Sequence, residues 1–440
     1  RIDSETATIG VQSIDFQPSL GSSEIDAYGA EADHTTELSG LGSAAPGTEV
    51  TISSPDLTDD ELFEVLDGDE RDSVERKDGE IRVEPPGQEP GIELSFRDFD
   101  AATYRFDLSP VGSEVETRLE LEVVDPEIDG SFGTDRHEVA AGDMVTVDIE
   151  LENADGAYLL VGADHKAREG RPTNYFDIVY VEGADNVTVN TRLLGTDADT
   201  EEIYQADGTV ESYLHGDADG SNRLSEVRFR GEDGRRSWES LTAFRAEMGM
   251  SAQPWPIQPE RYRFVLGADG TVELREDGIA DFAYPIARSN LQVTDPGVES
   301  VETYVAPRGP ANEPNSPSGP DSLEGLLERT TQRETVAKED RLVIEVNATG
   351  IYGALHYLSD GGVAGFGGGV HPEDAQKLLD KHEGVILEAL QTDMDENERR
   401  TELDLGGATD GEAYVLPDID ENNERVVDGR FYIVVDTRNA

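Results

Sequence analysis

The sequence predicts a mainly β protein of tandem immunoglobulin-like β-sandwich domains, with a C-terminal domain in which helices decorate the sheet. Two observations support this fold class. Strand-length runs of β-branched and aromatic residues recur along the 440 residues, with turn residues every 8–12 residues or so. Several runs also alternate apolar and polar residues, which is the pattern of a strand with one buried face.

Repeated Asp-Pro pairs, at Asp125-Pro126 and Asp295-Pro296, indicate two domain boundaries. We therefore expect an immunoglobulin-like β-sandwich at residues 1–125 and a β-sandwich with a helical insertion at 126–295. A mixed α+β/β-sandwich surface domain is expected at 296–440.

In the first block, Tyr104 follows Asp100 by four residues and opens a strand-like run, as in the tyrosine corner of immunoglobulin-like sandwiches. The alternative is that Tyr104 is an ordinary strand aromatic. A short helix is expected at Asp56–Leu66. The runs that predict strands are Ala7–Phe16, Glu49–Ser53, Glu80–Glu84, Gly91–Phe96, Thr103–Leu108 and Glu116–Val124.

The second block opens with an alternating run at Met144–Leu151. Asp269-Gly270 lies between two strand-like runs and predicts a hairpin turn. Ser237 is placed to cap a helix that carries Trp238 and Phe244. In the third block, five prolines between Pro307 and Pro320 indicate an extended loop, and Pro372 is placed in the first turn of a helix.

The charge balance restricts the environment and the partners. Asp plus Glu total 96 and Lys plus Arg total 35, so the formal net charge is -61. Molar salt shortens the Debye length to about 3 Å and screens the resulting repulsion. We therefore expect a halophilic source, cations as ligands, and binding neither to nucleic acid nor to anionic lipid. A disordered acidic chain is the alternative, but an apolar content of 36% favours folded cores.

The chain contains no Cys, which excludes disulfides and thiolate chemistry. It has no apolar run of about 18 residues, so no membrane span is expected within it. Since the first residue is Arg1, we expect a processed or truncated chain.

Five segments have a recognisable pattern: Glu138–Leu151 with its Val-Ala-Ala-Gly-Asp run, Ser322–Arg329, Glu334–Ile344, Thr401–Leu405 and Phe431–Thr437. These segments resemble haloarchaeal surface-layer glycoproteins and related secreted surface proteins. The resemblance covers roughly residues 130–440. It implies immunoglobulin-like modules displayed outside the cell, commonly glycosylated and anchored by a C-terminal segment. The Thr-rich stalk and the membrane-spanning tail of that pattern are absent from this sequence.

Acidic loops are the main candidates for a ligand site, with Ca²⁺ as the expected cofactor. One loop places oxygen donors at alternating positions typical of calcium loops, at Asp217, Asp219, Ser221, Ser225 and Glu226. The acid usually found at the twelfth position is replaced by Arg228. Weaker versions comprise Asp197, Asp199 and Glu201, and Asp418, Asp420 and Asn422. Because acids are abundant, such spacings also arise by chance.

Two sequons predict N-glycosylation, at Asn186 and Asn347. The glycine-rich run Gly361–Gly369 lacks the Lys and Ser/Thr of a phosphate loop, so an adaptable loop is the simpler interpretation. Neither a zinc-protease His motif nor a serine-nucleophile elbow occurs. Trp238, Trp255 and Tyr262 are interpreted as core residues rather than as a sugar-binding platform.

We therefore expect that the protein is not an enzyme but an extracellular structural protein of a halophilic archaeon. It would assemble with copies of itself into a surface layer or filament. The terminal run Ile9–Phe16 could complete the sheet of a neighbouring copy, and the alternative is that it forms the first strand of its own domain. The other functions considered are a cell-surface adhesin or carbohydrate-binding module and, third, a secreted hydrolase.

Overall fold

The computed structural model describes residues 16–29, 34–41, 48–66, 74–77, 79–84, 91–97, 99–163, 175–216, 222–232, 236–250, 257–308, 327–337, 340–358, 389–390, 402–403, 413–419 and 426–437. The chain forms two compact units. Unit 1 comprises Arg1–Asp129, Leu151–Ala157 and Ala268–Gly270, and unit 2 comprises Gly130–Glu150, Tyr158–Gly267 and Thr271–Ala440. The finer division into three domains stays a prediction.

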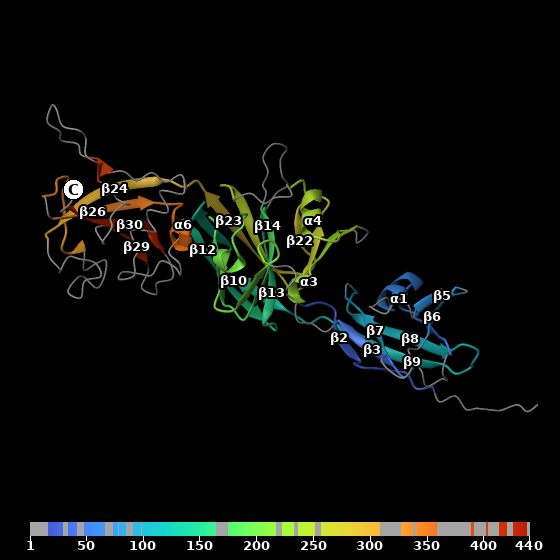
Figure 1. Cartoon of the computed structure of the whole chain (residues 1–440). Coiled ribbons are helices and arrows are strands. Elements are labelled where there is room, and N and C mark those ends of the chain that lie inside the picture. Colours follow the sequence, from blue (N-terminus) through green and yellow to red (C-terminus); the bar gives the residue numbers. More distant parts are fainter. Residues whose placement is uncertain are drawn as a thin grey trace, which may run out of the picture. The chain divides into compact units, whose positions relative to one another are not determined.

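Unit 1 is a β-sandwich of two sheets with one short helix (Figure 1). The smaller sheet has the order β1 (Ser19–Leu20), β3 (Thr35–Ser39), β7 (Ile92–Ser95). The larger sheet has the order β2 (Glu24–Asp26), β9 (Thr117–Val124), β8 (Ala102–Pro110), β4 (Val50–Ser53), β6 (Glu80–Val83), β5 (Val74–Lys77). Helix α1 (Asp59–Leu66) buries Leu62, Val65 and Leu66.

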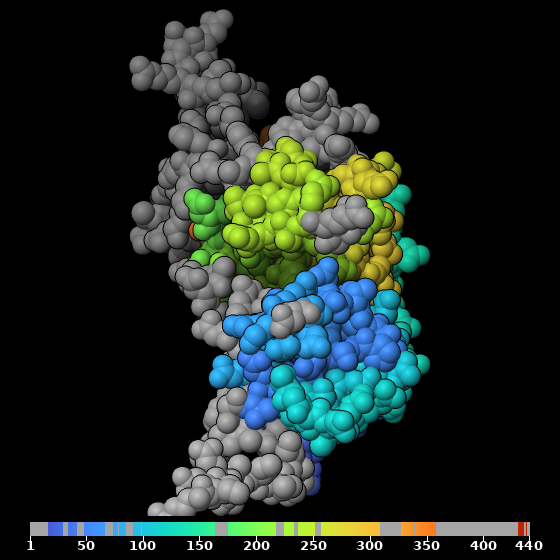
Figure 2. Space-filling model, turned by 90° about the vertical axis from the view of Figure 1, so that its right-hand side faces the viewer, coloured from blue at the N-terminus to red at the C-terminus, as the bar shows by residue number. Residues whose placement is uncertain are grey.

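The core of unit 1 follows directly from alternation in its strands. In β8, Tyr104, Phe106 and Leu108 are buried while the residues between them face outward. The Phe96 ring packs edge-on against the Phe106 ring, with 6.1 Å between the ring centroids. In the space-filling view of Figure 2, the described residues of unit 1 are coloured blue to cyan.

The predicted tyrosine corner is present. The Tyr104 hydroxyl donates a hydrogen bond of 2.8 Å to the backbone carbonyl of Asp100, and the side chain is buried. This contact fixes the chain where it enters β8. The prediction from the four-residue spacing is therefore confirmed.

The first two sheets of unit 2 repeat the arrangement of unit 1. One has the order β10 (Asp129–Phe132), β12 (Met144–Glu152), β15 (Asn186–Asn190), β16 (Tyr204–Gln205). The other has the order β11 (Arg136–Ala140), β23 (Pro285–Thr294), β20 (Arg261–Gly267), β13 (Gly156–Ala163), β14 (Phe176–Glu182), β17 (Thr209–Ser212).

The correspondence between the two sandwiches extends to strand direction. In each, an early strand runs parallel to the last strand, β2 to β9 and β11 to β23. On its other side, the last strand pairs with an antiparallel neighbour, which is β8 for β9 in unit 1 and β20 for β23 in unit 2. The next strand in the sheet is again antiparallel: β4 pairs with β8, and β13 pairs with β20. The predicted fold class, mainly β with tandem immunoglobulin-like sandwiches, is confirmed.

A second tyrosine corner, which the sequence analysis missed, marks the same place in unit 2. The Tyr262 hydroxyl donates to the Gln258 carbonyl at 3.0 Å and accepts from the Gln258 N–H at 3.1 Å. Tyr262 lies near the start of β20, as Tyr104 lies near the start of β8. Burial raises the pKa of Tyr262 to about 12, so its hydroxyl stays protonated and able to donate.

A small sheet of four strands decorates this sandwich. Its order is β19 (Ser237–Trp238), β18 (Arg228–Gly231), β21 (Thr271–Leu274), β22 (Ala280–Phe282). The helices α2 (Thr200–Ile203), α3 (Asn222–Ser225) and α4 (Leu241–Glu247) lie in the same part of the chain. All three helices lie between residues 126 and 295, and the predicted domain with a helical insertion at these bounds stays a prediction.

Two local predictions in this region are wrong. Asp269-Gly270 does not join a hairpin, because β21 pairs with β18 and β22 whereas β20 pairs with β13 and β23. The helix cap is Ser240 and not Ser237: the Ser240 hydroxyl accepts from the Ala243 N–H at 3.2 Å, and Ser237 belongs to β19. Both errors arise because the local sequence allows more than one strand partner and more than one serine as the cap. Pairing in the tertiary structure selects one of them.

The last sheet of unit 2 is antiparallel, with the order β25 (Thr331–Gln332), β24 (Val298–Ala306), β26 (Arg341–Ala348), β30 (Val426–Asp436), β29 (Ala413–Ile419). Strands β27 (Ala389–Leu390) and β28 (Glu402–Leu403) form a separate pair. Helix α6 (Tyr352–Leu358) follows β26. The predictions for residues 7–15, for most of the proline-rich loop, for Gly361–Gly369 and for the Pro372 helix lie outside the described residues.

The corners supply a direct test of the repeated fold. Replacing either corner tyrosine by phenylalanine, Tyr104→Phe or Tyr262→Phe, is expected to lower the free energy of unfolding by about 1 kcal/mol, because one buried hydrogen bond is lost. The measurement is denaturant unfolding at molar salt. Tyr357→Phe, at an exposed position, is the control and should change nothing. Equal effects of all three substitutions would contradict the role of the corners.

Candidate functional site

The turn between β11 and β12 contacts the chain segment at the start of α6. The Gly353 N–H donates to the Gly142 carbonyl at 2.8 Å, and the Tyr352 N–H donates to Asp143 Oδ1 at 3.1 Å. We call this contact the joint. Its residues are Gly142, Asp143, Asn190, Thr191, Gly350, Ile351, Tyr352 and Gly353. It links strands β12 and β15 to the segment after β26, so it ties two sheets of unit 2 together.

Glycine is required where the two segments cross. Gly142 has a φ of +103°, in the region that side chains rarely adopt, and a Cβ there would overlap the Gly350 carbonyl oxygen. A Cβ on Gly353 would overlap Asn190 Oδ1. The close approach of two backbones therefore explains the Gly-Asp pair within the Val-Ala-Ala-Gly-Asp run.

Buried polar side chains complete the joint. Asn190 is fully buried; its Nδ2 donates to the Gly353 carbonyl at 3.0 Å, and its Oδ1 accepts from the Arg192 N–H at 3.1 Å. Thr191 Oγ1 donates to the Asp143 carbonyl at 2.6 Å and accepts from the Gly142 N–H at 2.9 Å. Of these bonds, the one from Asn190 Nδ2 crosses to the α6 segment, so separating the segments would leave this buried amide without that partner. The bonds of Thr191 fix the turn that receives the segment.

Nearby, Gln205 Nε2 and His356 Nε2 lie 2.6 Å apart and link β16 to α6. Burial lowers the pKa of His356, which favours the neutral ring that accepts this hydrogen bond. The joint therefore extends from a turn of the sandwich to the body of the helix.

Asp143 is the charged residue of the joint. Burial raises its pKa above the ordinary value of 3.8, although N–H groups of Gly350, Tyr352 and Ile351 oppose the shift. A carboxylate with a raised folded pKa keeps its proton in the folded protein after the unfolded chain has lost it. Its contribution to stability therefore falls as the pH rises from 3.8 through the folded pKa.

This sign gives a test of the joint. At molar salt, wild-type protein should lose stability relative to Asp143→Asn as the pH rises from about 3.5 to 6, because only the wild type acquires the buried charge. Chemical denaturation at each pH gives the difference in unfolding free energy. Asp135→Asn, at an exposed position of the same unit, is the control. A difference between wild type and Asp143→Asn that does not change with pH would contradict the burial of this charge.

A second polar cluster lies in the sandwich of unit 2. Asp177 is fully buried; Asp177 Oδ2 accepts from Ser212 Oγ at 2.7 Å and from the Tyr204 hydroxyl at 2.9 Å, while Oδ1 accepts from the Leu214 N–H at 2.9 Å. Burial raises the pKa of Tyr204 and lowers the pKa of His215. The carboxylate is used to hold β14, β16 and the end of β17 together, which is a structural role.

The predicted calcium loop begins directly after this cluster. Asp217, Asp219 and Ser221 lie outside the described residues, Ser225 is exposed and Glu226 is half-buried. Among the described residues, no group of three or more His, Asp or Glu is placed to hold a metal. Calcium binding therefore stays a prediction.

The structure describes the first of the two weaker acidic loops fully and the second only in part. Asp199 precedes α2, and its N–H donates to the Glu202 carboxylate at 3.1 Å, so this spacing serves a helix start. Asp420 and Asn422 lie outside the described residues, and Asp418 belongs to β29.

The two sequons both lie on strands. Asn186 opens β15, is half-buried and pairs with Asp148. Asn347 lies in β26, and its Nδ2 donates to Glu299 Oε2 at 3.1 Å. Glycosylation at either position stays a prediction.

The interpretation of the aromatic residues as core is supported where they are described. The Trp238 ring packs edge-on against Phe244, with 5.2 Å between the centroids, and Tyr262 forms the second corner. Trp255 lies outside the described residues.

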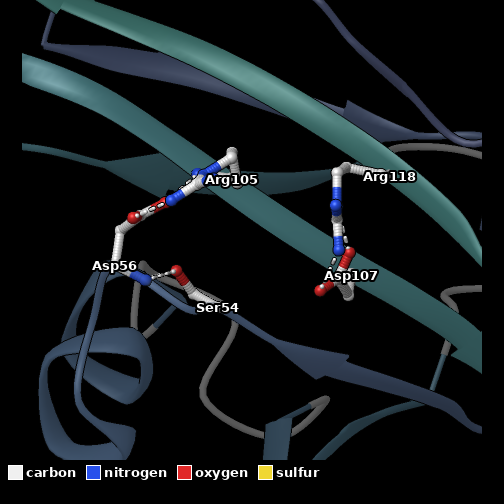
Figure 3. A network of polar contacts seen from close by, with 5 residues as sticks. All are labelled: Ser54, Asp56, Arg105, Asp107 and Arg118. Carbon is white, nitrogen blue, oxygen red and sulfur yellow. Dashed lines mark hydrogen bonds and ion pairs between the residues drawn. The ribbon is translucent and has the colours of Figure 1, made fainter.

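Unit 1 shows how arginine is used on its surface (Figure 3). Arg105 donates from Nε and Nη2 to the Asp56 carboxylate at 2.9 and 2.6 Å, and Arg118 donates likewise to Asp107 at 2.6 and 3.0 Å. The hydrogen bond from Arg105 lowers the pKa of Asp56. Each guanidinium thus forms a two-point pair with one carboxylate.

Sequence reasoning missed three functional features. The second corner carried a signal, because Gln258 precedes Tyr262 by the same four residues as Asp100 precedes Tyr104. Asp177 also has a signal in the sequence, because it is the single acid within an apolar run. The joint has no such signal, because its two segments are about 200 residues apart in the sequence.

The fold and the joint define a class: a protein of tandem immunoglobulin-like β-sandwiches in which buried polar contacts serve structure. Over 229 residues, the chain is 25% identical to "Cell surface glycoprotein 2" of Haloarcula hispanica. The match covers 52% of this chain and 21% of that protein, so the chain spans about a fifth of its length. This similarity confirms the predicted haloarchaeal cell-surface protein and its location at or outside the cell surface.

Comparison with family models gives no match. Among solved structures, similarity extends to surface layer protein SbsC, domains 1–6, at 11% identity and a TM-score of 0.15, covering 96% of this chain and 51% of that chain. It also extends to the eight N-terminal immunoglobulin domains of Down Syndrome Cell Adhesion Molecule, at 8% identity and a TM-score of 0.13, covering 83% and 29%. Scores this low carry no argument. Among the described residues, no helix is long and apolar enough to cross a membrane.

Proposed function

We propose that this chain is a structural subunit that assembles with copies of itself into an extracellular layer or filament of a halophilic archaeon. The observation that carries the proposal is the joint, in which Gly142, Asp143 and Asn190 hold the segment at the start of α6 by buried hydrogen bonds. Because its hydrogen bonds connect two sheets of unit 2, the joint would resist separation of those sheets under load. That property suits a load-bearing wall component.

The similarity to a haloarchaeal cell-surface glycoprotein supports the location but does not extend to assembly. Cations are the ligands that such an assembly requires, since the formal net charge of each copy is -61. We include Ca²⁺ at the loop of Asp217, Asp219, Ser221, Ser225 and Glu226, and glycans at Asn186 and Asn347. Mass spectrometry of peptides from the native protein tests the glycans.

An adhesin or carbohydrate-binding module is the second candidate. It needs exposed aromatic rings for a sugar to stack on, and Trp238 and Tyr262 are instead engaged in packing and in a corner. A secreted hydrolase is the third candidate, and the curated protein to which this chain is similar bears the name of a cell-surface glycoprotein. Both candidates therefore have less support than a structural role.

Electron microscopy of the purified chain at molar salt, with and without calcium, tests the proposal. We expect ordered sheets or filaments, with better order when calcium is present. The chelated sample is the matched control for the calcium contribution. Dispersed particles under every condition would contradict self-assembly and would favour an adhesin.

A further inference from the structure

One site in unit 2 collects positive charge on a strongly acidic chain. The Asp281 carboxylate on β22 is buried, with 1% of the side chain exposed. Its Oδ2 contacts Arg275 Nη2 at 2.5 Å, Arg288 Nη2 at 2.8 Å and Arg263 Nη1 at 3.6 Å. Three guanidinium groups therefore converge on a single carboxylate oxygen. We call these four residues the arginine cluster.

The stoichiometry of the cluster differs from that of the arginine pairs in unit 1. Arg105 with Asp56 and Arg118 with Asp107 are one-to-one pairs that use two nitrogens of each guanidinium (Figure 3). In the cluster, three guanidinium groups share one carboxylate oxygen. Arginines therefore outnumber carboxylates among these four residues, while the whole chain carries a net charge of -61.

Two of the arginines are open to solvent. The side chains of Arg275 and Arg288 are 41% and 46% exposed, whereas that of Arg263 is 13% exposed. Among the described residues, Asp281 is the only carboxylate that contacts Arg275 or Arg288. Each guanidinium has five N–H donors, and one nitrogen of each is used on Asp281. The remaining donors of both can reach one incoming carboxylate, because both groups are held against the same oxygen.

The buried carboxylate explains why the arginines gather there. Without Asp281, three guanidinium groups at this spacing would repel one another. With Asp281, they are held in a fixed arrangement in which little side-chain freedom remains to be lost on binding. The guanidinium fork also matches a carboxylate in shape, so that contact retains directional hydrogen bonds where salt screens longer-range attraction.

We propose that the arginine cluster binds an exposed Asp or Glu side chain of a second copy of this chain. This inference rests on the proposed self-assembly and names its contact. Charge complementarity selects the occupant, because a copy with 96 acidic residues presents carboxylates on its surface, and this site offers two exposed guanidinium groups that share one buried carboxylate. The contact joins different surfaces of the two copies. Such heterologous contacts form open arrays when the rotation between copies does not close into a ring, and a layer or a filament requires that geometry.

The test compares two double variants with the same net charge. Arg275→Gln/Arg288→Gln removes the exposed arginines of the cluster and leaves Arg263 on Asp281. Arg136→Gln/Arg236→Gln, the control, removes two exposed arginines that each face a single glutamate. Sedimentation velocity at molar salt measures the concentration at which half of the chains are associated. Circular dichroism checks that each variant is folded.

We expect that concentration to rise at least tenfold in Arg275→Gln/Arg288→Gln and to stay within about twofold of wild type in the control. If the double variant fails to fold, Arg288→Gln alone should raise it at least threefold. Equal association of both double variants, whether retained or lost, would overturn the role of the cluster while leaving self-assembly in place. Wild-type protein that stays monomeric at every concentration would overturn the proposed function and this contact together.

Discussion

Every contact of this protein forms against the mutual repulsion of 96 carboxylates, of which the 35 basic residues can balance only a part. Two consequences of this constraint are visible in the structure. Arginine is placed where a carboxylate gives it fixed geometry, as at Asp56, Asp107 and Asp281. Acids that enter the interior, such as Asp143 and Asp177, are surrounded by N–H and O–H donors. The remaining repulsion is the part that salt in the medium must screen.

Within unit 2, the joint also uses few charged groups. Most of its contacts use backbone groups and neutral side chains, namely Asn190, Thr191, Gln205 and His356, so they do not weaken as salt rises. The single carboxylate, Asp143, receives backbone N–H groups instead of a basic partner.

Much of the fold could be predicted from local pattern. The alternation in Met144–Leu151 and the spacing of Asp100 and Tyr104 each depend on residues close in sequence, and both predictions are confirmed. The predictions that failed required a choice between neighbours: β21 pairs with β18 rather than β20, and Ser240 rather than Ser237 caps α4.

The sites were far less accessible to sequence reasoning than the fold. In a chain with 96 acids, a single buried acid such as Asp281 is indistinguishable in sequence from the many acids that face solvent. The arginines that meet it come from β20, from the end of β21 and from β23, so only the folded sheets bring them together. Gly142 and Gly353 are likewise far apart in the sequence, and only the tertiary fold brings them into contact.

The central claim is that this protein works as a repeating structural element outside the cell. Cryo-electron tomography of cells that make it, with the chain labelled by gold-conjugated antibody fragments, tests that claim most directly. The account predicts label outside the membrane at regular spacings within a sheet or along filaments. Label scattered singly over the surface without periodicity, or label confined to the cell interior, would contradict it.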